Sequence, residues 1–297
     1  MSIRSKFDRM RLMKKELNVG YIRLFYHYTF NKNKEFKIAL QNGLNINIKY
    51  GLSSLAKLLS NGWKIISVED GLLTLEGNNN TVITCRTRIG FDFGHLEEIY
   101  INKQYGYDFT GKNIIDIGMS NGDSSIYFAK NGAKRVIGLE PDKRSFNLAV
   151  KNIKSSKVDN VVIPLNKALT VNDGNVELIV DGDNPNANSI DVKNMVKLNS
   201  EKHKEVVEGM TLKKIMDLFN GEPIDLLKMD CEGCEYSILN NANREIFAKI
   251  KSIEMEFHNG IQNLPKILNE NGFTFNVSNS ADLTGYIRAK KVDSLNF

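Results

Sequence analysis

The stretch that decides the fold is NIIDIGMSNGDSSIYFAKNGAKRVIGLE, residues 113–140. It opens with an apolar run, NIIDIG (113–118), and closes with another, RVIGLE (135–140). Short apolar runs bounded by turn residues are typical of buried strands, and SSIYFAK (124–130), which ends at Asn131-Gly132, is typical of a short helix. The stretch therefore predicts two parallel strands joined by a helix.

The same alternation continues toward the C-terminus. We expect further strands at 160–169, 225–230 and 252–258, and a terminal hairpin from FTFNVSN (273–279) and GYIRAKK (285–291). Short connections between alternating strands and helices imply a mostly parallel sheet covered on both faces, which is an α/β fold. Residues 172–210 interrupt this order with two strand candidates, VELIVDG and EVVEG, around a polar loop.

The region before residue 109 has a different pattern. Its first 60 residues indicate helices, and WKIISVED, GLLTLE and TVITCRTR (63–88) alternate like the strands of a small β-meander. We expect two domains: residues 1–108, a helical and small-β extension that makes substrate or partner contacts, and residues 109–297, a ligand-binding α/β domain.

Composition excludes several classes of protein. With 41% hydrophobic and 25% charged residues, the chain is typical of a soluble protein with a sizeable core. No apolar stretch approaches the roughly 20 residues of a membrane span. The basic start lacks the apolar block of a signal peptide, so we expect a cytoplasmic protein.

The positive charge is concentrated at the N-terminus. Residues 1–50 contain 11 Lys and Arg against 3 Asp and Glu, whereas the whole chain has a net charge of +5. Such a segment, here with aromatic residues between positions 21 and 30, can bind RNA or a membrane surface, but charge runs more often only face water. Nucleic acid is therefore a minor alternative among the partners that we expect.

The loop after the first predicted strand indicates the ligand. Asp116, Gly118 and Gly122 form D-x-G-x-x-x-G, which differs from the G-x-G-x-x-G of pyrophosphate-binding loops. An aspartate at the entry of this loop would repel a pyrophosphate but suits a ligand with a sulfonium group. Glu140 ends the second strand, where an acidic residue binds the hydroxyls of a ribose. Together these residues predict S-adenosylmethionine as the cofactor, and an NAD-dependent oxidoreductase is the least favoured alternative.

These blocks, followed by NKAL, LLKMDCEGCEYSIL and IEMEFH, resemble the FkbM family of S-adenosylmethionine-dependent methyltransferases. The resemblance covers about residues 95–290, and its most distinctive motif is Lys228-Met-Asp-Cys-Glu-Gly-Cys-Glu235. It implies a class I methyltransferase, Rossmann-like fold with a seven-stranded sheet whose last strand is antiparallel. It also implies methyl transfer to a hydroxyl of a glycan or small metabolite. Met119-Ser120-Asn121 departs from the family's usual Ala-Asn-Ile, so contacts to the methionine part of the cofactor are expected to differ.

The predicted cofactor-binding residues follow the ends of the first three strands, with one residue from the fourth. They are Asp116, Gly118, Ser120, Asn121, Gly122, Asp123, Glu140, Pro141, Ala168 and Asp230.

An alcohol acceptor must lose its proton during methyl transfer, so a base is expected nearby. The predicted catalytic residues are Asp230 and Glu232, after the fourth strand, and His258, after the fifth. In SIEMEFH, Glu254, Glu256 and His258 share one side of a strand. An ordinary imidazole pKa near 6.5 suits His258 to base catalysis. Whether Asp230 or His258 takes the proton stays open at this point.

The pair Cys231 and Cys234 has three interpretations. A structural zinc site needs four ligands, and Cys85 and the histidines do not supply them at a recognisable spacing. A redox couple is disfavoured because Glu232 and its acidic neighbours should raise the thiol pKa. We expect two small buried side chains in the family's apolar positions. No metal is predicted; Mg²⁺ held by Asp230 and substrate hydroxyls is compatible with the sequence without being predicted by it.

The leading functional prediction is an O-methyltransferase. A non-catalytic S-adenosylmethionine-binding or scaffold protein and an RNA methyltransferase that uses residues 1–50 are the alternatives. If the protein binds the cofactor, turnover indicates an O-methyltransferase and its absence indicates a binding or scaffold protein. A steep salt dependence of RNA binding indicates the RNA methyltransferase.

Overall fold

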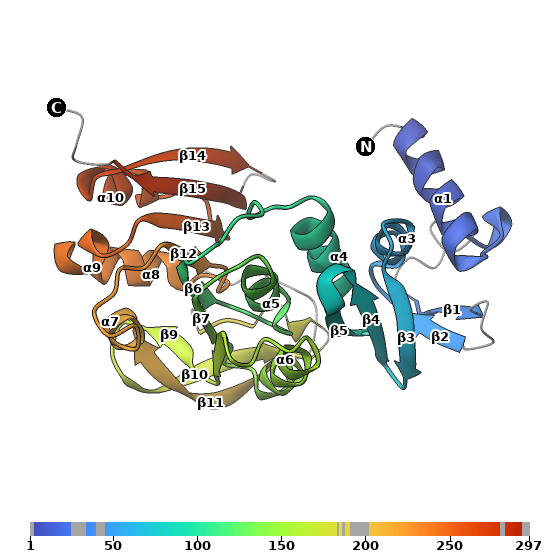
Figure 1. The fold of residues 1–297 in the computed structure, drawn as a ribbon, viewed down its shortest axis with the longest axis horizontal. Coiled ribbons are helices and arrows are strands. Elements are labelled where there is room, and N and C mark those ends of the chain that lie inside the picture. The colour runs from blue at the N-terminus through green and yellow to red at the C-terminus, as the bar shows by residue number, and fades with distance from the viewer. Residues whose placement is uncertain are drawn as a thin grey trace. The chain divides into compact units, whose positions relative to one another are not determined.

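The computed structural model describes residues 3–24, 34–39, 45–182, 184–185, 188–190, 202–279 and 283–292. The chain divides into two compact units, Met1–Gly106 and Tyr107–Phe297, and each is described by itself (Figure 1). Most of the aromatic positions noted between 21 and 30 lie outside the described residues. Within the described part of the chain, no helix combines the length and apolar character that a membrane span requires.

The first unit contains helices and small sheets. Its elements are α1 (Ile3–Leu17), β1 (Phe36–Ala39), β2 (Asn45–Ile48), α3 (Leu52–Ser60), β3 (Lys64–Glu69), β4 (Leu72–Gly77), η1 (Asn78–Asn80), β5 (Thr81–Arg86), α4 (Asp92–Leu96) and η2 (Glu97–Ile101). Strands β3, β4 and β5 pair antiparallel in sequence order, which confirms the expected β-meander. Leu55 and Ala56 of α3 and Leu73 and Leu75 of β4 are fully buried. A salt bridge of 2.6 Å between the buried Arg86 and Asp92 side chains links β5 to α4.

The second unit alternates strands and helices. Its elements are β6 (Asn113–Ile117), α5 (Asp123–Lys130), β7 (Arg135–Leu139), α6 (Lys143–Ser155), β8 (Val162–Leu165), β9 (Ala168–Thr170), β10 (Gly174–Asp181), β11 (Lys202–Thr211), α7 (Leu212–Asp217), β12 (Leu226–Met229), α8 (Cys234–Asn241), α9 (Arg244–Ala248), β13 (Ser252–Phe257), α10 (Leu264–Glu270), β14 (Phe273–Asn279) and β15 (Gly285–Lys291).

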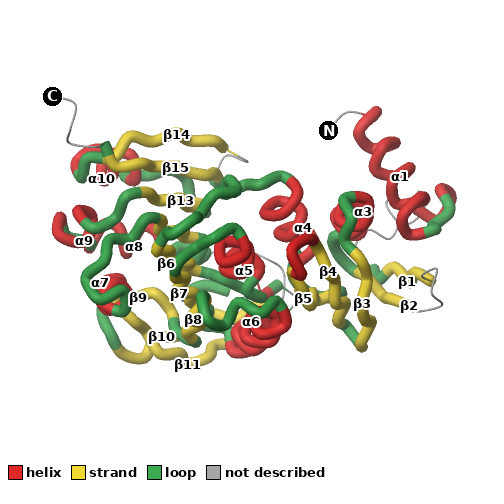
Figure 2. Tube along the Cα trace, viewed as in Figure 1, coloured by secondary structure: helices red, strands yellow, loops and turns green. Residues whose placement is uncertain are grey.

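Seven of these strands form one sheet in the order β14-β15-β13-β12-β6-β7-β8 (Figure 2). The five strands from β13 to β8 are parallel to one another. The last strand, β15, lies between β13 and β14 and is antiparallel to both. This order confirms the predicted α/β fold, including the terminal hairpin and the antiparallel last strand.

Helices cover both faces of this sheet. The chain moves in one direction from β6 to β8 and in the other from β12 to β13, so right-handed connections place α5 and α6 opposite α8 and α10 (Figure 1). Every residue of β6 and of β12 is buried, as expected for central strands covered on both faces.

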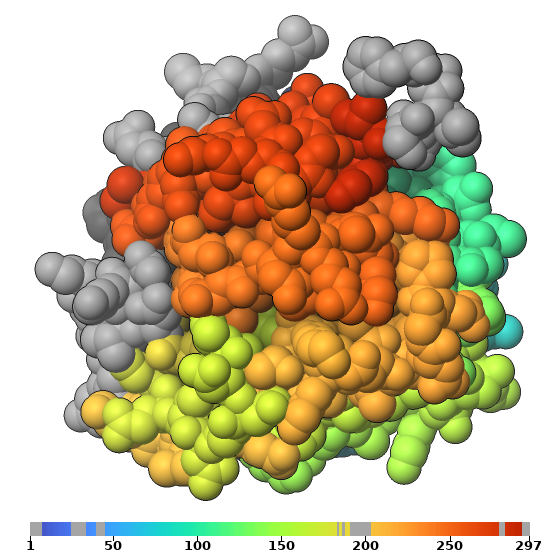
Figure 3. Space-filling model, turned by 90° about the vertical axis from the view of Figure 1, so that its left-hand side faces the viewer, coloured from blue at the N-terminus to red at the C-terminus, as the bar shows by residue number. Residues whose placement is uncertain are grey.

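The predicted third strand at 160–169 is wrong as a single element. The chain leaves the large sheet after Leu165, and Ala168–Thr170 forms β9 of a separate three-stranded sheet in the order β10-β11-β9. The Asn166 side chain donates hydrogen bonds to the carbonyl oxygens of Glu140 and Pro141, which holds the chain where it changes sheets. Both strand candidates in the interrupting region are confirmed, as β10 and β11. Figure 3 shows the yellow-green residues of β9 and β10 next to the orange residues of the α8 region on one face.

Candidate functional site

The candidate site lies where four neighbouring strands end. β7, β6, β12 and β13 are adjacent and parallel, and their registers align Leu139, Ile117, Met229 and Met255 near their carboxyl ends. The loops after these strands therefore meet at one edge of the sheet, which is where parallel α/β sheets bind ligands.

The loop after β6 passes directly against the loop after β12. Gly118 has a φ of 73°, and a Cβ at this position would lie 1.9 Å from the carbonyl oxygen of Asp230. Glycine is therefore required here by the approach of two protein backbones as well as by the left-handed φ. Ser120 and Gly122, with φ values of 45° and 87°, also adopt the left-handed region, so the loop turns sharply before α5.

Asp116 lies inside the protein and not on the surface of the loop. Its carboxylate is fully buried, forms a 3.0 Å salt bridge with Lys228 and accepts hydrogen bonds of 2.6 Å from Ser124 and Ser125. Burial lowers the pKa of Lys228, but the carboxylates of Asp116, Asp230 and Asp123 together outweigh that effect and raise it. The ammonium group of Lys228 also donates to the carbonyl oxygen of Gly118 at 2.7 Å. The contacts of Asp116 thus hold the loop in place, and its direct contact with a cofactor stays a prediction.

Glu140 connects the loops after β6 and β7. Its carboxylate accepts a 3.0 Å hydrogen bond from the backbone N–H of Ser120 and a 2.8 Å hydrogen bond from that of Asp142. Asp142 in turn caps α6 by accepting from the backbone N–H groups of Arg144 and Ser145. Burial raises the pKa of Asp142, but hydrogen bonds and charge from Arg144 outweigh it and hold the pKa below its usual value.

The other predicted cofactor residues lie in the same loops or at the start of β9. Asn121 is buried, and its side-chain N–H₂ group has no hydrogen-bond partner among the described residues. Asp123 opens α5, and Ala168 is the buried first residue of β9. Pro141 follows Glu140 directly. Their roles in cofactor binding stay predictions.

Two residues with positive φ shape the loop after β12. Glu232 has a φ of 54° and Gly233 a φ of 116°, so the chain reverses before α8. Glu235, in the first turn of α8, is fully buried and accepts hydrogen bonds from the backbone N–H groups of Cys231 and Gly233 at 3.0 and 2.9 Å. The two glutamates of the E-G-x-E motif therefore differ in role. Glu235 fixes the loop by hydrogen bonds to its backbone, whereas Glu232 lies in the turn itself.

Cys231 and Cys234 form a disulfide. The prediction of two separate small side chains is therefore wrong. The turn at Glu232 and Gly233 brings the two Cα atoms to 5.5 Å, within the range that a disulfide spans. Cys234 is buried in the apolar core and Cys231 is half-buried against it, so their apolar surroundings were predicted correctly.

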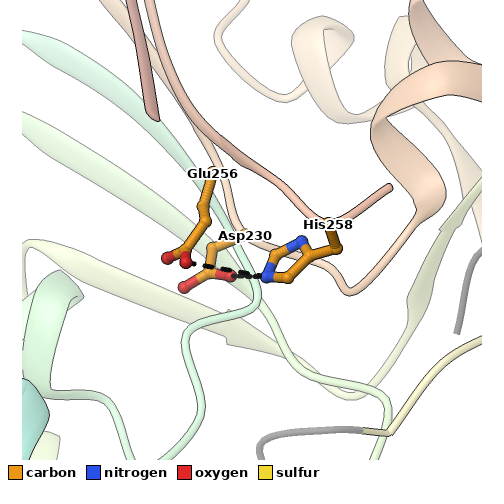
Figure 4. Close-up of side chains that lie close together, drawn as sticks. All are labelled: Asp230, Glu256 and His258. Atoms are coloured by element: carbon orange, nitrogen blue, oxygen red, sulfur yellow. Dashed lines mark ion pairs between the residues drawn. The ribbon is translucent and has the colours of Figure 1, made fainter. Parts of the chain in front are cut away.

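Two of the three predicted catalytic residues, Asp230 and Glu232, lie near the imidazole of the third, His258. Figure 4 shows Asp230 and His258 together with Glu256. The Nε2 atom of His258 lies 3.7 Å from Asp230 Oδ1 and 3.6 Å from Glu232 Oε1. Two further carboxylates complete the cluster: Glu256 Oε1 is 3.9 Å from Nε2, and Glu235 Oε1 is 3.5 Å from Nδ1. We call these five residues the acid–histidine cluster. Its side chains range from fully buried Glu235 to Asp230 and Glu256, which are 31% and 37% exposed.

The cluster changes the ionisation of its members. Burial lowers the pKa of His258, but Glu235, Glu232 and Asp230 raise it to about 10. Burial and the carboxylates of Asp230, Glu235 and Glu256 raise the pKa of Glu232 to about 8, against the opposing effect of His258. The expected imidazole pKa near 6.5 is therefore wrong: in these surroundings His258 carries a proton at neutral pH, and its catalytic role stays a prediction.

A short segment of the interrupting region joins the two halves of the site. The Asn188 side chain donates to the carboxylate of Asp142 at 2.8 Å, and the Ser189 hydroxyl donates to the carbonyl oxygen of Glu232 at 2.6 Å. Residues 188–190 thus link the loop after β7 to the loop after β12.

Sequence reasoning left Glu235 and Glu256 out of the predicted site. A signal existed for both residues. Glu256 shares the strand side of His258 in SIEMEFH, and Glu235 completes the E-G-x-E motif. Both side chains lie near His258 in the structure, but His258 is remote from Glu235 in the sequence. Neither sequence pattern by itself therefore indicated the cluster. Glu254, on the same strand side, accepts a 2.7 Å hydrogen bond from Tyr286 of β15 instead.

Comparisons with known proteins agree with this architecture. Residues 116–275 match the family described as the methyltransferase FkbM domain. Over 101 residues the chain is 29% identical to the ribosomal protein L11 methyltransferase of Alkaliphilus oremlandii (strain OhILAs), a match that covers 34% of this chain and 28% of the relative. The chain thus spans little more than a quarter of that curated relative's length.

Two solved structures are similar at low identity. One is the FkbM methyltransferase of Methylobacillus flagellatus KT, at 15% identity and a TM-score of 0.45, covering 66% of this chain and 50% of that one. The other is the magnesium protoporphyrin IX methyltransferase of Synechocystis PCC 6803 with bound S-adenosylmethionine, at 13% identity and a TM-score of 0.36, covering 67% and 79%. Because the family match extends over more than half of the sequence, this chain belongs to the FkbM methyltransferase family.

Proposed function

We propose that this protein transfers a methyl group from S-adenosylmethionine to a hydroxyl group of a glycan or small metabolite. The observation that carries the proposal is the contact between two loops. Gly118 of the predicted cofactor loop lies against the backbone of Asp230, whose side chain belongs to the acid–histidine cluster. A methyl donor bound by the first loop would therefore lie next to an acceptor substrate bound by the cluster.

The described residues fit the cofactor at two positions. The Asn121 side-chain N–H₂ group is a buried donor without a partner among the described residues, so a ligand's acceptor atom can satisfy it. Glu140 directly follows β7, and backbone hydrogen bonds from Ser120 and Asp142 fix its carboxylate at the sheet edge, where an acidic residue binds the hydroxyls of a ribose. When bound, the cofactor supplies an electrophilic methyl group on a sulfonium.

The cluster supplies what an alcohol acceptor needs. Methyl transfer requires the acceptor oxygen, the methyl carbon and the sulfur in line, and the hydroxyl proton must leave. Asp230 and Glu232, with side chains 31% and 19% exposed, can be reached from solvent and border His258. We assign Asp230 and Glu232 to binding the acceptor hydroxyl and Asp230 to receiving its proton, because the raised pKa of Glu232, about 8, keeps that group mostly protonated at neutral pH. We assign protonated His258 to holding the two side chains in position.

The test combines binding and turnover. Calorimetry with S-adenosylmethionine should show binding to the wild-type chain and to Asp230→Asn and Glu232→Gln. Mass spectrometry of hydroxylated acceptors should show the gain of one methyl group with wild type only. Glu245→Gln, at an exposed carboxylate on α9, is the matched control and should retain turnover. Cofactor binding without turnover on any acceptor would favour a non-catalytic S-adenosylmethionine-binding protein. Tighter binding of NAD would overturn the proposal.

A further inference from the structure

Three side chains of the acid–histidine cluster have the arrangement of metal ligands. One carboxylate oxygen each from Asp230 and Glu256 and one nitrogen of His258 lie within 4.8 Å of one another (Figure 4). Asp230 follows β12, whereas Glu256 lies in β13 and His258 directly after it. The three ligand atoms therefore come from adjacent parallel strands, whose backbone hydrogen bonds set their spacing.

The distances from His258 to the surrounding carboxylates are longer than those of a hydrogen-bonded imidazole and suit a metal-ligating one. A charged N–H···O pair is usually 2.7–2.9 Å long. Here Nε2 points among Asp230, Glu232 and Glu256 at 3.6–3.9 Å and is within ordinary hydrogen-bond distance of none of them. The residue is only 8% exposed, and the nearest carboxylate to its Nδ1, that of Glu235, is 3.5 Å away, longer than an ordinary hydrogen bond.

The spacing suits a cation at the centre of the three atoms. Ligand atoms about 2.1 Å from a tetrahedral ion lie roughly 3.4 Å apart, so the distances of 3.7 and 3.9 Å from Nε2 to Asp230 and Glu256 need to shorten only slightly. Glu235 Oε1, 3.5 Å from Nδ1, occupies the place of the carboxylate that commonly orients a metal-bound histidine.

We propose that Asp230, Glu256 and His258 bind a divalent transition-metal ion, such as Mn²⁺ or Zn²⁺, at the end of the sheet. Two carboxylates and one imidazole favour such an ion over Mg²⁺, which prefers oxygen ligands alone. Three protein ligands leave a coordination position open, as in catalytic metal sites. The carboxylates that attract a proton to the imidazole also attract a dication in its place.

The role of this ion rests on the proposed function. The acceptor hydroxyl takes the open position, and the ion favours its deprotonation. The acceptor oxygen then forms a bond to the methyl carbon, the carbon–sulfur bond breaks with its electron pair going to sulfur, and S-adenosylhomocysteine leaves. With Asp230 engaged as a ligand, the hydroxyl proton passes to water at the exposed side of the cluster, where the Asp230 and Glu256 side chains are 31% and 37% exposed.

Mn²⁺ titration of the chelator-treated full chain, followed by electron paramagnetic resonance, tests the site. We expect one Mn²⁺ per chain, competed by Zn²⁺ but not by an equal concentration of Mg²⁺. Hyperfine coupling to one imidazole nitrogen should be present in wild type and absent in His258→Gln. The Mn²⁺ affinity of Glu256→Gln should fall at least about tenfold.

Glu254→Gln is the matched control, because Glu254 lies on the same side of β13 but accepts its hydrogen bond from Tyr286. It should bind Mn²⁺ like wild type, and thermal unfolding should show that every variant is folded. Equal Mn²⁺ affinity in wild type, Glu256→Gln and His258→Gln would overturn the site. Unchanged methyl transfer in chelator would overturn the ion's role but leave the proposed function standing. Specific Mn²⁺ binding without any methylated product would support the site while contradicting the function.

Discussion

Replacing Lys228 with methionine should strongly destabilise the second unit. Lys228 is 2% exposed and Asp116 is fully buried, so Lys228→Met leaves an aspartate without its cation in the centre of the sheet. The carbonyl oxygens of Ile117 and Gly118 also lose their Lys228 donor. Removing one partner of a buried pair costs about 3–5 kcal/mol. At about 2–4 °C per kcal/mol for a unit of this size, the melting temperature should fall by roughly 6–20 °C.

The assay is urea-induced unfolding of the full chain followed by circular dichroism. Fluorescence is unsuitable because the single tryptophan, Trp63, lies in the first unit. The double variant Asp116→Asn/Lys228→Met should lose less free energy of unfolding than the two single losses added together, because no buried charge remains. Lys266→Met is the control: its side chain is 75% exposed and its ammonium group lies 3.9 Å from Glu270, a surface pair that contributes at most about 0.5 kcal/mol. A loss for Lys228→Met as small as that of Lys266→Met would refute the reasoning.

Three further predictions concern the loops of the site. Replacing Cys231 and Cys234 with serine should lower the free energy of unfolding by about 2 kcal/mol for so short a loop, and a thiol reagent should label either cysteine only after reduction. Asp142→Ala should lose about 0.5–2 kcal/mol at pH 7 in urea unfolding. Because the pKa of Asp142 is lowered on folding, its contribution is present above the unfolded value and is lost as pH falls through the folded pKa, so wild type and variant should converge in acid. Gly118→Ala should abolish calorimetric binding of S-adenosylmethionine, since its Cβ would collide with Asp230; unchanged affinity would contradict the placement of this loop.

The parallel sheet could be predicted from local patterns. Apolar runs such as NIIDIG and RVIGLE, joined by a short helix, have few other arrangements because both faces must be buried. The run at 160–169 was misjudged because apolar residues stand on both sides of Asn166 and Lys167, and periodicity does not show where a chain leaves one sheet for another. Asn166 holds the chain where it changes sheets, through hydrogen bonds to Glu140 and Pro141 of a different loop. Nothing in the sequence distinguishes it from any other polar residue.

The site was predictable only in part. Asp230, Glu232 and His258 follow strands, and the ends of parallel strands meet, so their convergence follows from the fold. The pKa of His258 did not follow, because it is raised by the carboxylates of Glu235, Glu232 and Asp230, which the loop after β12 and the first turn of α8 bring to the imidazole. The disulfide was missed for a related reason: C-x-x-C spacing does not reveal the positive φ values at Glu232 and Gly233 that bring the two Cα atoms together.

The sequence by itself determined the strand–helix order, the glycine of the cofactor loop and membership of the FkbM family, because each depends on residues close together in the chain. Only the tertiary structure decided which groups interact: Asp116 with Lys228, and His258 with Glu235 and Glu256. Electrostatic interactions depend on distance and burial, and both are properties of the assembled sheet.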